Sequence, residues 1–574
     1  MNIFKYCQKE ILKIIKENSE KIGINNSADF IEITIESPPE KFDCDLSTNI
    51  AMVLGKKNRV SPLDLAKKII NILQNKTKLF KKINIAGPGF INFVLSEPLL
   101  ITFINEINKQ NEQYGSSNNK KNYNIEFVSA NPTGPMHIGH CRGAVFGDVL
   151  ANLLRFNGNN VTKEYYINDY GNQVENFVKS IFLRMREIKH GEKFIDRKEL
   201  YSGHYIVQIA EKILKTNKNI DIKKFDQVSD KLKTLSLRMS MEMIKDDLKM
   251  LGVSHDVFKS ESNIVKKDLV NKAVENLKKN NFVIDGFLEK PKGEDTKNWK
   301  KKKRMIFKST MFGDDADRAL QKDDGSWTYF ANDIAYLSDK ISRNFDILIN
   351  VLGADHTGYI KRITSAVQAL SQKKINLNCK VCQLVKLYKK GKPFKMSKRS
   401  GEFITVNELL NEVNKDAVRF MMLSRSNDVE IEFDFDKVIE KNKDNQIYYI
   451  QYCYARINSL FNSTRINLSE KTLLKIKKLN LNSFEKKLLR KVFEWPKLIE
   501  IASTKLEPHR ITFYLYQLAT IFHAYWSIGN EKNEFKFIQN GKIKSETTFT
   551  IIKLVSIVIK NGMNILNVSL PNKM

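Results

Sequence analysis

Residues 123–390 alternate short apolar segments with amphipathic ones, and this alternation limits the possible folds more than any other feature of the sequence. It predicts an α/β architecture, a doubly wound parallel sheet of the Rossmann type with helices on both faces. The expected strands span 125–128, 160–167, 347–352 and 381–387, and the first expected helix spans 139–156. A long helical and polar stretch, about 174–320, interrupts the alternation, and we interpret it as an insertion in the sheet.

Other parts of the chain show different patterns. Residues 1–115 combine an apolar helical stripe with alternating, strand-like segments, which predicts a small α+β domain. The polar sequence GSSNNKKN at 115–122 is a candidate linker, so the sheet domain is expected over 120–390. Residues 437–574 show helical apolar spacing without strand alternation, which predicts an all-α domain. Residues 391–436 would connect the sheet domain to it.

The charge balance is strongly basic. Among 574 residues, 95 Lys and Arg outnumber 65 Asp and Glu, which gives a net charge of +30. Such an excess suits a polyanionic partner, most simply a nucleic acid. The lysines are spread over the whole chain, however, and a solvated surface explains them equally well. The densest run, 297–304, fits a solvated loop first and a nucleic-acid contact second.

Six cysteines are too few for a disulfide framework, which indicates a reducing compartment. Cys379 and Cys382 form a C-x-x-C pair without a second pair at matching spacing, so we expect core cysteines and no bound zinc. No stretch approaches the ~20 uninterrupted apolar residues that span a bilayer. The first 18 residues resemble neither a signal peptide nor a transit peptide. We therefore expect a cytoplasmic protein without a membrane partner.

The sequence EFVSANPTGPMHIGH at 126–140 is the most informative segment. It follows an expected strand and opens an expected helix, and its prolines and Gly134 enforce a loop between the two. The start of a helix offers unpaired N–H groups and a positive dipole end to a phosphate. His137 and His140 can donate hydrogen bonds to phosphate oxygens, and Gly139 leaves room for a flat base. Two incidental histidines in a turn are the alternative.

A second segment, KPFKMSKRSG at 392–401, follows the expected strand 381–387. Lys395 and Lys398 flank Ser397 in a loop between two glycines. Two ammonium groups can neutralise the charge that develops on a leaving polyphosphate. A basic surface loop is the alternative, but the pairing with the histidine segment across an α/β sheet favours the phosphate role.

These two motifs resemble the signatures H-I-G-H and K-M-S-K-S of the class I aminoacyl-tRNA synthetases, with Arg399 in place of the last Ser. The surrounding sequence is similar to the arginyl-tRNA synthetases over essentially the whole chain. The segments that carry this resemblance are CDLSTNIAM (44–52), AGPGFINF (86–93), EFVSANPTGPMHIGH (126–140), YYINDYGNQ (165–173), FGDDADR (312–318), DGSWTYFANDIAY (324–336), GADHTGYIKR (353–362), KMSKRSGEFITVNEL (395–409) and YYIQYCYARI (448–457).

The resemblance implies a reaction. The family joins L-arginine to ATP, forming arginyl-adenylate and pyrophosphate, and transfers the arginyl group to the 2′-hydroxyl of the terminal adenosine of tRNA(Arg), which releases AMP. Mg²⁺ accompanies ATP, and the usual form of the family is a monomer. The 1–115 region would contact tRNA, and the 437–574 region would bind the anticodon.

The resemblance also implies site residues. Catalysis and ATP binding would involve His137, His140, Lys395 and Lys398, and Gly139 and Ser397 would also contact ATP. Arginine would be bound by Glu126, Ser129, Asn131, Tyr329, Asp333 and Asp355, although many relatives have Gln where Asp355 stands. Tyr329 and Asp333 are four residues apart in a helical pattern, so they share one face. Carboxylates are the natural partners of a guanidinium.

Contacts with tRNA are expected from Tyr449, Tyr452 and the terminal Met574. Aromatic side chains suit stacking on unpaired bases, and buried core tyrosines are the alternative. Two other functions compete with arginine activation. One is a class I synthetase for another amino acid, which Tyr329 and Asp333 disfavour because they suit a cationic substrate. The other is a non-catalytic RNA-binding protein, which the intact signature residues disfavour.

Overall fold

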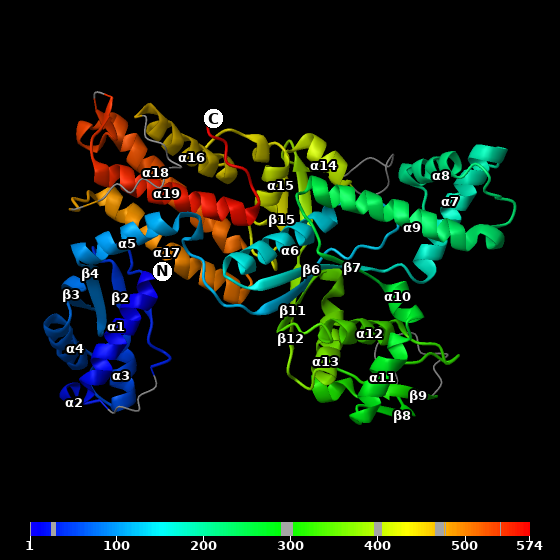
Figure 1. Ribbon diagram of the computed structural model, residues 1–574, viewed down its shortest axis with the longest axis horizontal. Helices are drawn as coiled ribbons and strands as arrows, with labels where there is room; N and C mark the ends of the chain where they lie inside the picture. Colours follow the sequence, from blue (N-terminus) through cyan, green and yellow to red (C-terminus); the bar gives the residue numbers. More distant parts are fainter. Residues whose placement is uncertain are drawn as a thin grey trace.

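The computed structural model describes residues 2–24, 30–288, 302–394, 404–464, 476, 478–539 and 541–574. A central parallel sheet carries the N-terminal domain and the C-terminal helices on one side, and two helical parts extend from its other side (Figure 1). The expected residues Lys395, Ser397 and Lys398 and most of the basic run 297–304 lie outside the described residues.

The N-terminal part is an antiparallel sheet packed against helices. Its strands occur in the order β1-β2-β4-β3. They are β1 (Ile35–Glu36), β2 (Leu46–Thr48), β3 (Phe80–Ala86) and β4 (Phe90–Leu95), and the helices are α1 (Ile3–Glu17), α2 (Ser19–Ile22), α3 (Ile50–Asn58), α4 (Pro62–Lys76) and α5 (Glu97–Gln110). Helix α4 begins at Pro62 because Ser61 accepts a hydrogen bond at its N-terminus and proline fits the first turn.

The central sheet has five parallel strands in the order β12-β11-β5-β6-β7. They are β5 (Asn122–Glu126), β6 (Asn160–Ile167), β7 (Val257–Ser260), β11 (Ile347–Gly353) and β12 (Asn376–Cys382). The chain passes from β5 through α6 (Ile138–Phe156) to β6, whereas β11 lies on the other side of β5. The strand order therefore reverses at β5, and a crevice opens there at the carboxyl ends of the strands.

The two faces of the sheet belong to two cores. Ile349 on β11 packs in the core that contains α6, whereas its neighbour Leu348 packs with α12 (Tyr329–Ile341) and α13 (Ile360–Leu370). Figure 1 shows α6 on one side of the strands and α12 and α13 on the other. The alternation of side chains along each buried strand produces this double burial.

The stretch 174–320 was expected to be a helical insertion, and this expectation is only partly right. Helices α7 (Asn172–His190), α8 (His204–Thr216) and α9 (Phe225–Met250) form a bundle with its own core. The same stretch also supplies β7 to the parallel sheet and, beyond α10 (Glu261–Lys266) and α11 (Leu269–Lys279), an antiparallel sheet of β8 (Val283–Phe287), β9 (Lys303–Phe307) and β10 (Arg318–Ala319). Strand β7 is short and only half-buried, so it leaves no alternation in the sequence.

The expected strand 381–387 is two strands. Strand β12 ends at Cys382, and β13 (Val385–Lys389) begins a separate sheet with β14 (Lys392–Pro393) and β15 (Ile431–Asp434). Helices α14 (Val406–Glu412) and α15 (Lys415–Met422) lie between β14 and β15 in the chain. The apolar run of the sequence continues across Gln383 and Leu384, which hides the change of sheet.

The C-terminal part consists of α16 (Gln446–Ser463), α17 (Ser483–Lys505), α18 (His509–Glu531) and α19 (Glu546–Leu566), and it also contains a short hairpin of β16 (Ile538–Gln539) and β17 (Lys542–Ile543). Within the described residues from 437 onward, the all-α expectation is therefore correct except for this hairpin. Among the described helices, α19 alone is long and apolar enough to cross a membrane. Its apolar window is 89% buried within the protein, as in a core helix.

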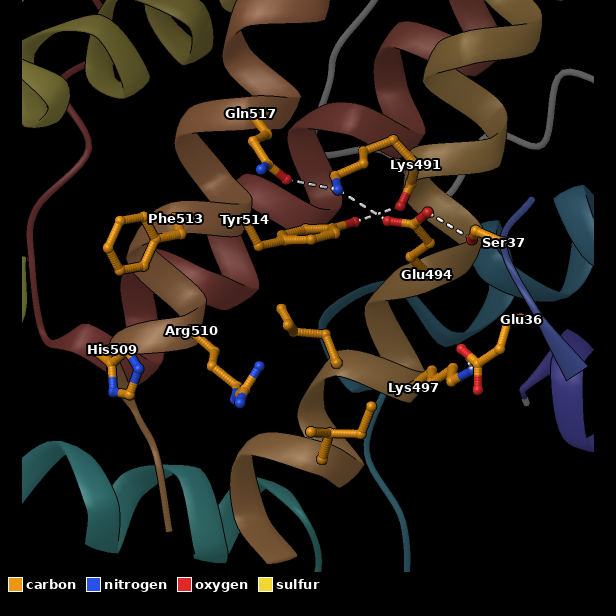
Figure 2. A pocket seen from close by; sticks show the side chains of 12 residues that line it. Glu36, Ser37, Lys491, Glu494, Lys497, His509, Arg510, Phe513, Tyr514 and Gln517 are labelled. Carbon is orange, nitrogen blue, oxygen red and sulfur yellow. Dashed lines mark hydrogen bonds and ion pairs between the residues drawn. The ribbon is translucent and has the colours of Figure 1, made fainter. Parts of the chain in front are cut away.

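Helix α17 holds the N-terminal part through polar contacts (Figure 2). The Ser37 hydroxyl donates to Glu494 at 2.6 Å, and Lys497 pairs with Glu36. These residues line a cavity of about 490 Å³ between β1, α17 and α18. Its lysines are engaged by neighbouring acids and carbonyls, since Lys491 also donates to Glu494 at 2.8 Å. The cavity is thus part of a polar interface between the two ends of the chain.

Candidate active site

The site lies where β5 ends and α6 begins. A cavity of about 790 Å³ opens there, within the usual range of small-molecule sites. Its lining includes Asn131, both histidines of the first motif, Thr405, and residues 196–198, 200–203 and 205 from the insertion. The structure thus brings the histidine segment together with a loop of the helical bundle and with the residues that follow the lysine motif.

His137 and His140 form one unit at the start of α6. Their ring centroids are 3.9 Å apart, and each Nδ1 accepts a backbone N–H, from Gly139 at 3.1 Å and from His137 at 3.3 Å. Burial lowers the pKa of both rings, that of His140 to about 3 with His137 adding to the effect. Both imidazoles are therefore neutral at pH 7. Because Nδ1 is an acceptor, the ring proton sits on Nε2, which makes each ring a neutral donor.

Gly139 makes room for this arrangement. A Cβ at this position would stand 2.9 Å from the Cε1 and Nδ1 atoms of His137. Real Cβ atoms essentially never approach that closely. The glycine therefore allows the His137 ring to fold over the first turn of the helix, a requirement that the sequence alone does not show.

The segment that follows the lysine motif pairs with the histidine segment. Ile138 N–H donates to the Ile404 carbonyl at 2.9 Å, and Val406 N–H donates to the Met136 carbonyl at 3.0 Å. Ile404 is the first described residue after Lys398. The first described residues after the lysine motif are thus held beside the histidine segment, with Thr405 opposite His137.

A second group of side chains lies at the same end of β5. Glu126, its last residue, forms an ion pair with the fully buried Lys340 and accepts a hydrogen bond from the Tyr336 hydroxyl at 3.1 Å. The Ser129 hydroxyl donates to Glu126 at 3.2 Å. Val128 and Ser129 have φ angles of 69° and 40°, a conformation that costs energy for side chains of this kind. The strained turn directs Ser129 back toward Glu126.

Asp333 stands on α12 facing the same region, and its carboxylate accepts a hydrogen bond from the Tyr359 hydroxyl. Its pKa is raised to about 7, chiefly by burial and also by the carboxylates of Glu261 and Glu126, while the hydrogen bond from Tyr359 opposes the shift. Burial also raises the pKa of Glu261. The pKa of Asp333 thus lies near neutral pH, and a cation bound beside it would lower that pKa by stabilising the carboxylate.

Tyr166 lies among these acids. Its ring stacks on Tyr336 with centroids 4.2 Å apart, and four carboxylates act on its hydroxyl, namely Glu261, Asp333, Glu126 and Asp169. The hydroxyl is buried and has no hydrogen-bond partner among the described residues. We call the region of Glu126, Tyr166, Glu261, Asp333 and Tyr359 the acidic chamber.

The remaining expected arginine contacts are less enclosed. Asn131 donates to Gln173 from the wall of the 790 Å³ cavity. Tyr329 is 59% exposed at the start of α12, with its hydroxyl beside Gly171. Asp355 is exposed and lies 3.4 Å from His356 Nε2. Glu126 and Asp333 belong to the acidic chamber and Ser129 donates to Glu126, whereas Asp355 lies beside His356, outside the chamber.

The expected tRNA-contacting residues lie on the C-terminal helices, away from this site. Tyr449 and Tyr452 on α16 are half-buried and pack against His523 of α18, with centroids 4.1 and 5.7 Å away. The guanidinium of Arg456 stacks on Tyr452 at 4.0 Å. The last residues of the chain run along α16, since Gln451 donates to the Ser569 carbonyl. Met574 is half exposed.

Among the described residues, no group of three or more His, Cys, Asp or Glu side chains is arranged to hold a metal ion. Cys379 and Cys382 carry free thiols on β12, half-buried and buried respectively.

Sequence patterns did not indicate Tyr359, Tyr166, Glu261 and Lys340 as site residues. Tyr359 and Tyr166 belong to the segments GADHTGYIKR and YYINDYGNQ, which carry the family resemblance. The sequence therefore marked these segments, but it did not indicate what either tyrosine contacts. Glu261 and Lys340 have no local signal. They reach the site only through the fold, because Glu261 directly follows β7 of the same sheet and Lys340 of α12 pairs with Glu126 at the end of β5.

Comparisons with known proteins agree with this architecture. Residues 103–462, more than half of the chain, match the family model described as the catalytic domain of class I (R) tRNA synthetases. Residues 9–95 match the arginyl-tRNA synthetase N-terminal domain, and residues 450–574 match the DALR anticodon-binding domain. Fold and site thus define a class I tRNA synthetase.

Individual relatives narrow the class. The chain is 51% identical over 577 residues to an arginine–tRNA ligase of Pelagibacter ubique, covering 100% of both chains. A crystal structure of a putative arginyl-tRNA synthetase from Campylobacter jejuni is 30% identical, with a TM-score of 0.73, and covers 84% of this chain and 100% of its own. The Thermus thermophilus arginyl-tRNA synthetase shares the fold, at 16% identity and a TM-score of 0.68 over 99% of this chain and 100% of its own.

The chain belongs to the arginyl-tRNA synthetase family. Aminoacylation of tRNA with arginine, at the expense of ATP, is the known reaction of this family.

Proposed function

We propose that this chain activates L-arginine with ATP and transfers the arginyl group to the 2′-hydroxyl of the terminal adenosine of tRNA(Arg). The observation that carries the proposal is the junction, at the carboxyl end of β5, of an acidic chamber with a cavity capped by two neutral imidazoles. The first suits a cationic side chain, and the second suits a triphosphate. Only three residues of chain, 127–129, separate Glu126 of the chamber from Ala130 in the wall of the cavity.

In this assignment the acidic chamber receives the guanidinium. Glu126 and Asp333 supply carboxylates, Tyr329 stands at the exposed edge, and Ser129, Asn131 and Asp355 contact the amino-acid end. A guanidinium stays protonated at all relevant pH values, so it would stabilise Asp333 as a carboxylate. A neutral side chain of similar size would bring no cation to the Asp333 carboxylate, which disfavours it.

The histidine cavity receives ATP. The Nε2–H groups of His137 and His140 would donate to phosphate oxygens without adding charge, and Gly139 would lie on the adenine side. The start of α6 adds its own N–H groups. Lys395, Ser397 and Lys398 would contact the β- and γ-phosphates. Lys398 precedes Ile404 by six positions, and a chain of that length spans at most roughly 20 Å, so the pairing of Ile404 with Ile138 supports this reach.

The chemistry needs no enzyme nucleophile. The arginine carboxylate attacks the α-phosphorus, a new C–O–P linkage forms, the bond to the bridging oxygen breaks, and pyrophosphate leaves. The 2′-hydroxyl of the tRNA then attacks the acyl carbon, and AMP leaves. Mg²⁺ would enter bound to ATP. The protein contributes positioning and charge stabilisation, and Lys398 is the group we assign to the charge that develops on the leaving phosphates.

The two ends of the chain would bind the rest of the tRNA. Residues 1–115 contact its body, and 437–574 contact the anticodon, with Tyr449, Tyr452 and Met574 at the surface of α16. We further propose that the protein works as a monomer in the cytoplasm, with the domain limits expected from the sequence.

Lys398→Ala tests the ATP assignment. We expect at least a tenfold loss in arginine-dependent ATP–pyrophosphate exchange with tRNA present, and no change in thermal unfolding. Lys392→Ala, an exposed lysine just before the motif, is the matched control and should keep wild-type exchange. Wild-type exchange in Lys398→Ala would refute the assignment.

A further inference from the structure

One backbone position joins the two catalytic segments to the helical bundle. The carbonyl of Met136 accepts from Val406, as described above, and its N–H donates to Oδ2 of Asp247 at 2.8 Å. Met136 has no exposed surface, and Asp247 is 6% exposed. Both partners are buried, so removal of Asp247 would deprive the Met136 N–H of its acceptor away from bulk water.

Asp247 stands in the last turns of α9, a helix that is anchored at both ends. Val228 and Leu232, near its start, belong to the core of the α7–α9 bundle, whereas Ile244 and Leu248 belong to the main core. Helix α9 also packs against α14, which begins at Val406. The carboxylate is thus presented from a rigid support.

The position of Met136 matters because the next residue is His137, the N-cap of α6. One residue further, Ile138 donates to Ile404 at the end of the lysine segment. A shift of Met136 would move the first imidazole and the anchor of the lysine segment together. Catalysis that depends on positioning loses large factors from displacements of about 1 Å.

We propose that Asp247 is a positioning residue for adenylate formation: it fixes the Met136 backbone and thereby sets the histidine pair and the anchor of the lysine segment relative to each other. This role rests on the ATP assignment of the previous section. The acceptor oxygen, rather than the negative charge, is what the geometry requires.

The test compares four full-length variants with the wild type in arginine-dependent ATP–pyrophosphate exchange with tRNA present. Asp247→Ala removes the acceptor, Asp247→Asn keeps an acceptor oxygen without the charge, and Ser240→Ala is the control. The Ser240 hydroxyl is buried on the same helix and has no partner among the described residues. Asp247→Leu repeats the loss with a side chain of similar volume, in case the alanine variant does not fold.

We expect Asp247→Ala and Asp247→Leu to lower kcat at least tenfold, with the KM for arginine within twofold of the wild type. Asp247→Asn should stay within threefold of the wild-type kcat, and Ser240→Ala should match it. Wild-type kcat in a folded alanine or leucine variant would overturn the proposal. So would an asparagine variant as slow as alanine, or an equal loss in Ser240→Ala. A wild-type protein without arginine-dependent exchange would refute the proposed function instead.

Discussion

The protonation of Asp333 should control how tightly the enzyme binds arginine. Burial and the neighbouring carboxylates raise its pKa from 3.8 to about 7 in the free protein. The guanidinium of arginine needs the ionised form as its partner, and it keeps its own proton throughout the accessible range. Binding should therefore strengthen as the pH rises through 7.

The size of the effect follows from the pKa. With a pKa of about 7, roughly one Asp333 in eleven is ionised at pH 6 and about ten in eleven at pH 8. If only the ionised form binds, the KM for arginine should fall about tenfold between pH 6 and pH 8. The KM for ATP should change much less, since burial lowers the pKa of His137 and lowers that of His140 to about 3.

The assay is ATP–pyrophosphate exchange at saturating ATP and tRNA, with arginine varied at half-unit steps from pH 6 to pH 8.5. Asp333→Asn is the control, with a raised KM that changes less than twofold across the range. A wild-type KM for arginine that does not change with pH would refute the reasoning. An equal pH dependence in Asp333→Asn would assign it to another group.

The same shift predicts a stability effect of known sign. The folded pKa of Asp333 lies above its unfolded value, so the unfolded chain loses its proton first as the pH rises. Its contribution to the free energy of unfolding therefore falls between about pH 4 and pH 7. Asp333→Asn should raise the unfolding temperature at pH 8 and leave it unchanged at pH 4, as measured by calorimetry.

Two further changes test other parts of the structure. Tyr166→Phe removes a buried hydroxyl that has no hydrogen-bond partner among the described residues. The free energy of unfolding measured in urea should therefore stay equal or rise by up to about 1–3 kcal/mol. A clear fall in that free energy would mean that the hydroxyl has a partner. Phe90→Ala removes a 39% exposed aromatic ring at the β3–β4 turn, where a tRNA base could stack. Loss of one stacked base should weaken tRNA binding roughly five- to a hundredfold in a filter assay, with the KM for arginine unchanged. Unchanged tRNA affinity would contradict a tRNA-contacting role for this ring.

Strong local patterns made much of the fold predictable. The helix expected over 139–156 is α6, shifted by one residue, and the strand expected over 160–167 coincides with β6. Both have long periodic segments bounded by Pro/Gly or polar turns. The edge strand β7 was hidden because four half-buried residues carry no period, and β13 was hidden because one apolar run crosses two sheets.

The site also contains one part that the sequence predicts and another that only the fold brings together. His137 and His140 stand in one local motif whose spacing already places both rings at a helix start. The acidic chamber is assembled from β5, β6, α10, α12 and the 3-10 helix Ala354–Tyr359, and its first and last residues, Glu126 and Tyr359, lie more than 200 positions apart in the chain. Sequence spacing suggested Asp333, but its partner Tyr359 and the raised pKa depend on burial, which only the folded chain creates.

Amino-acid selectivity tests the central claim most directly. Purified protein, total tRNA and ATP would be incubated with each of the standard amino acids and with citrulline, the neutral relative of arginine, and acylated tRNA would be measured. The account predicts charging with arginine alone, and citrulline at the background level. Charging with an uncharged amino acid, or no charging with arginine, would contradict an acidic chamber that selects a cationic side chain beside an ATP cavity.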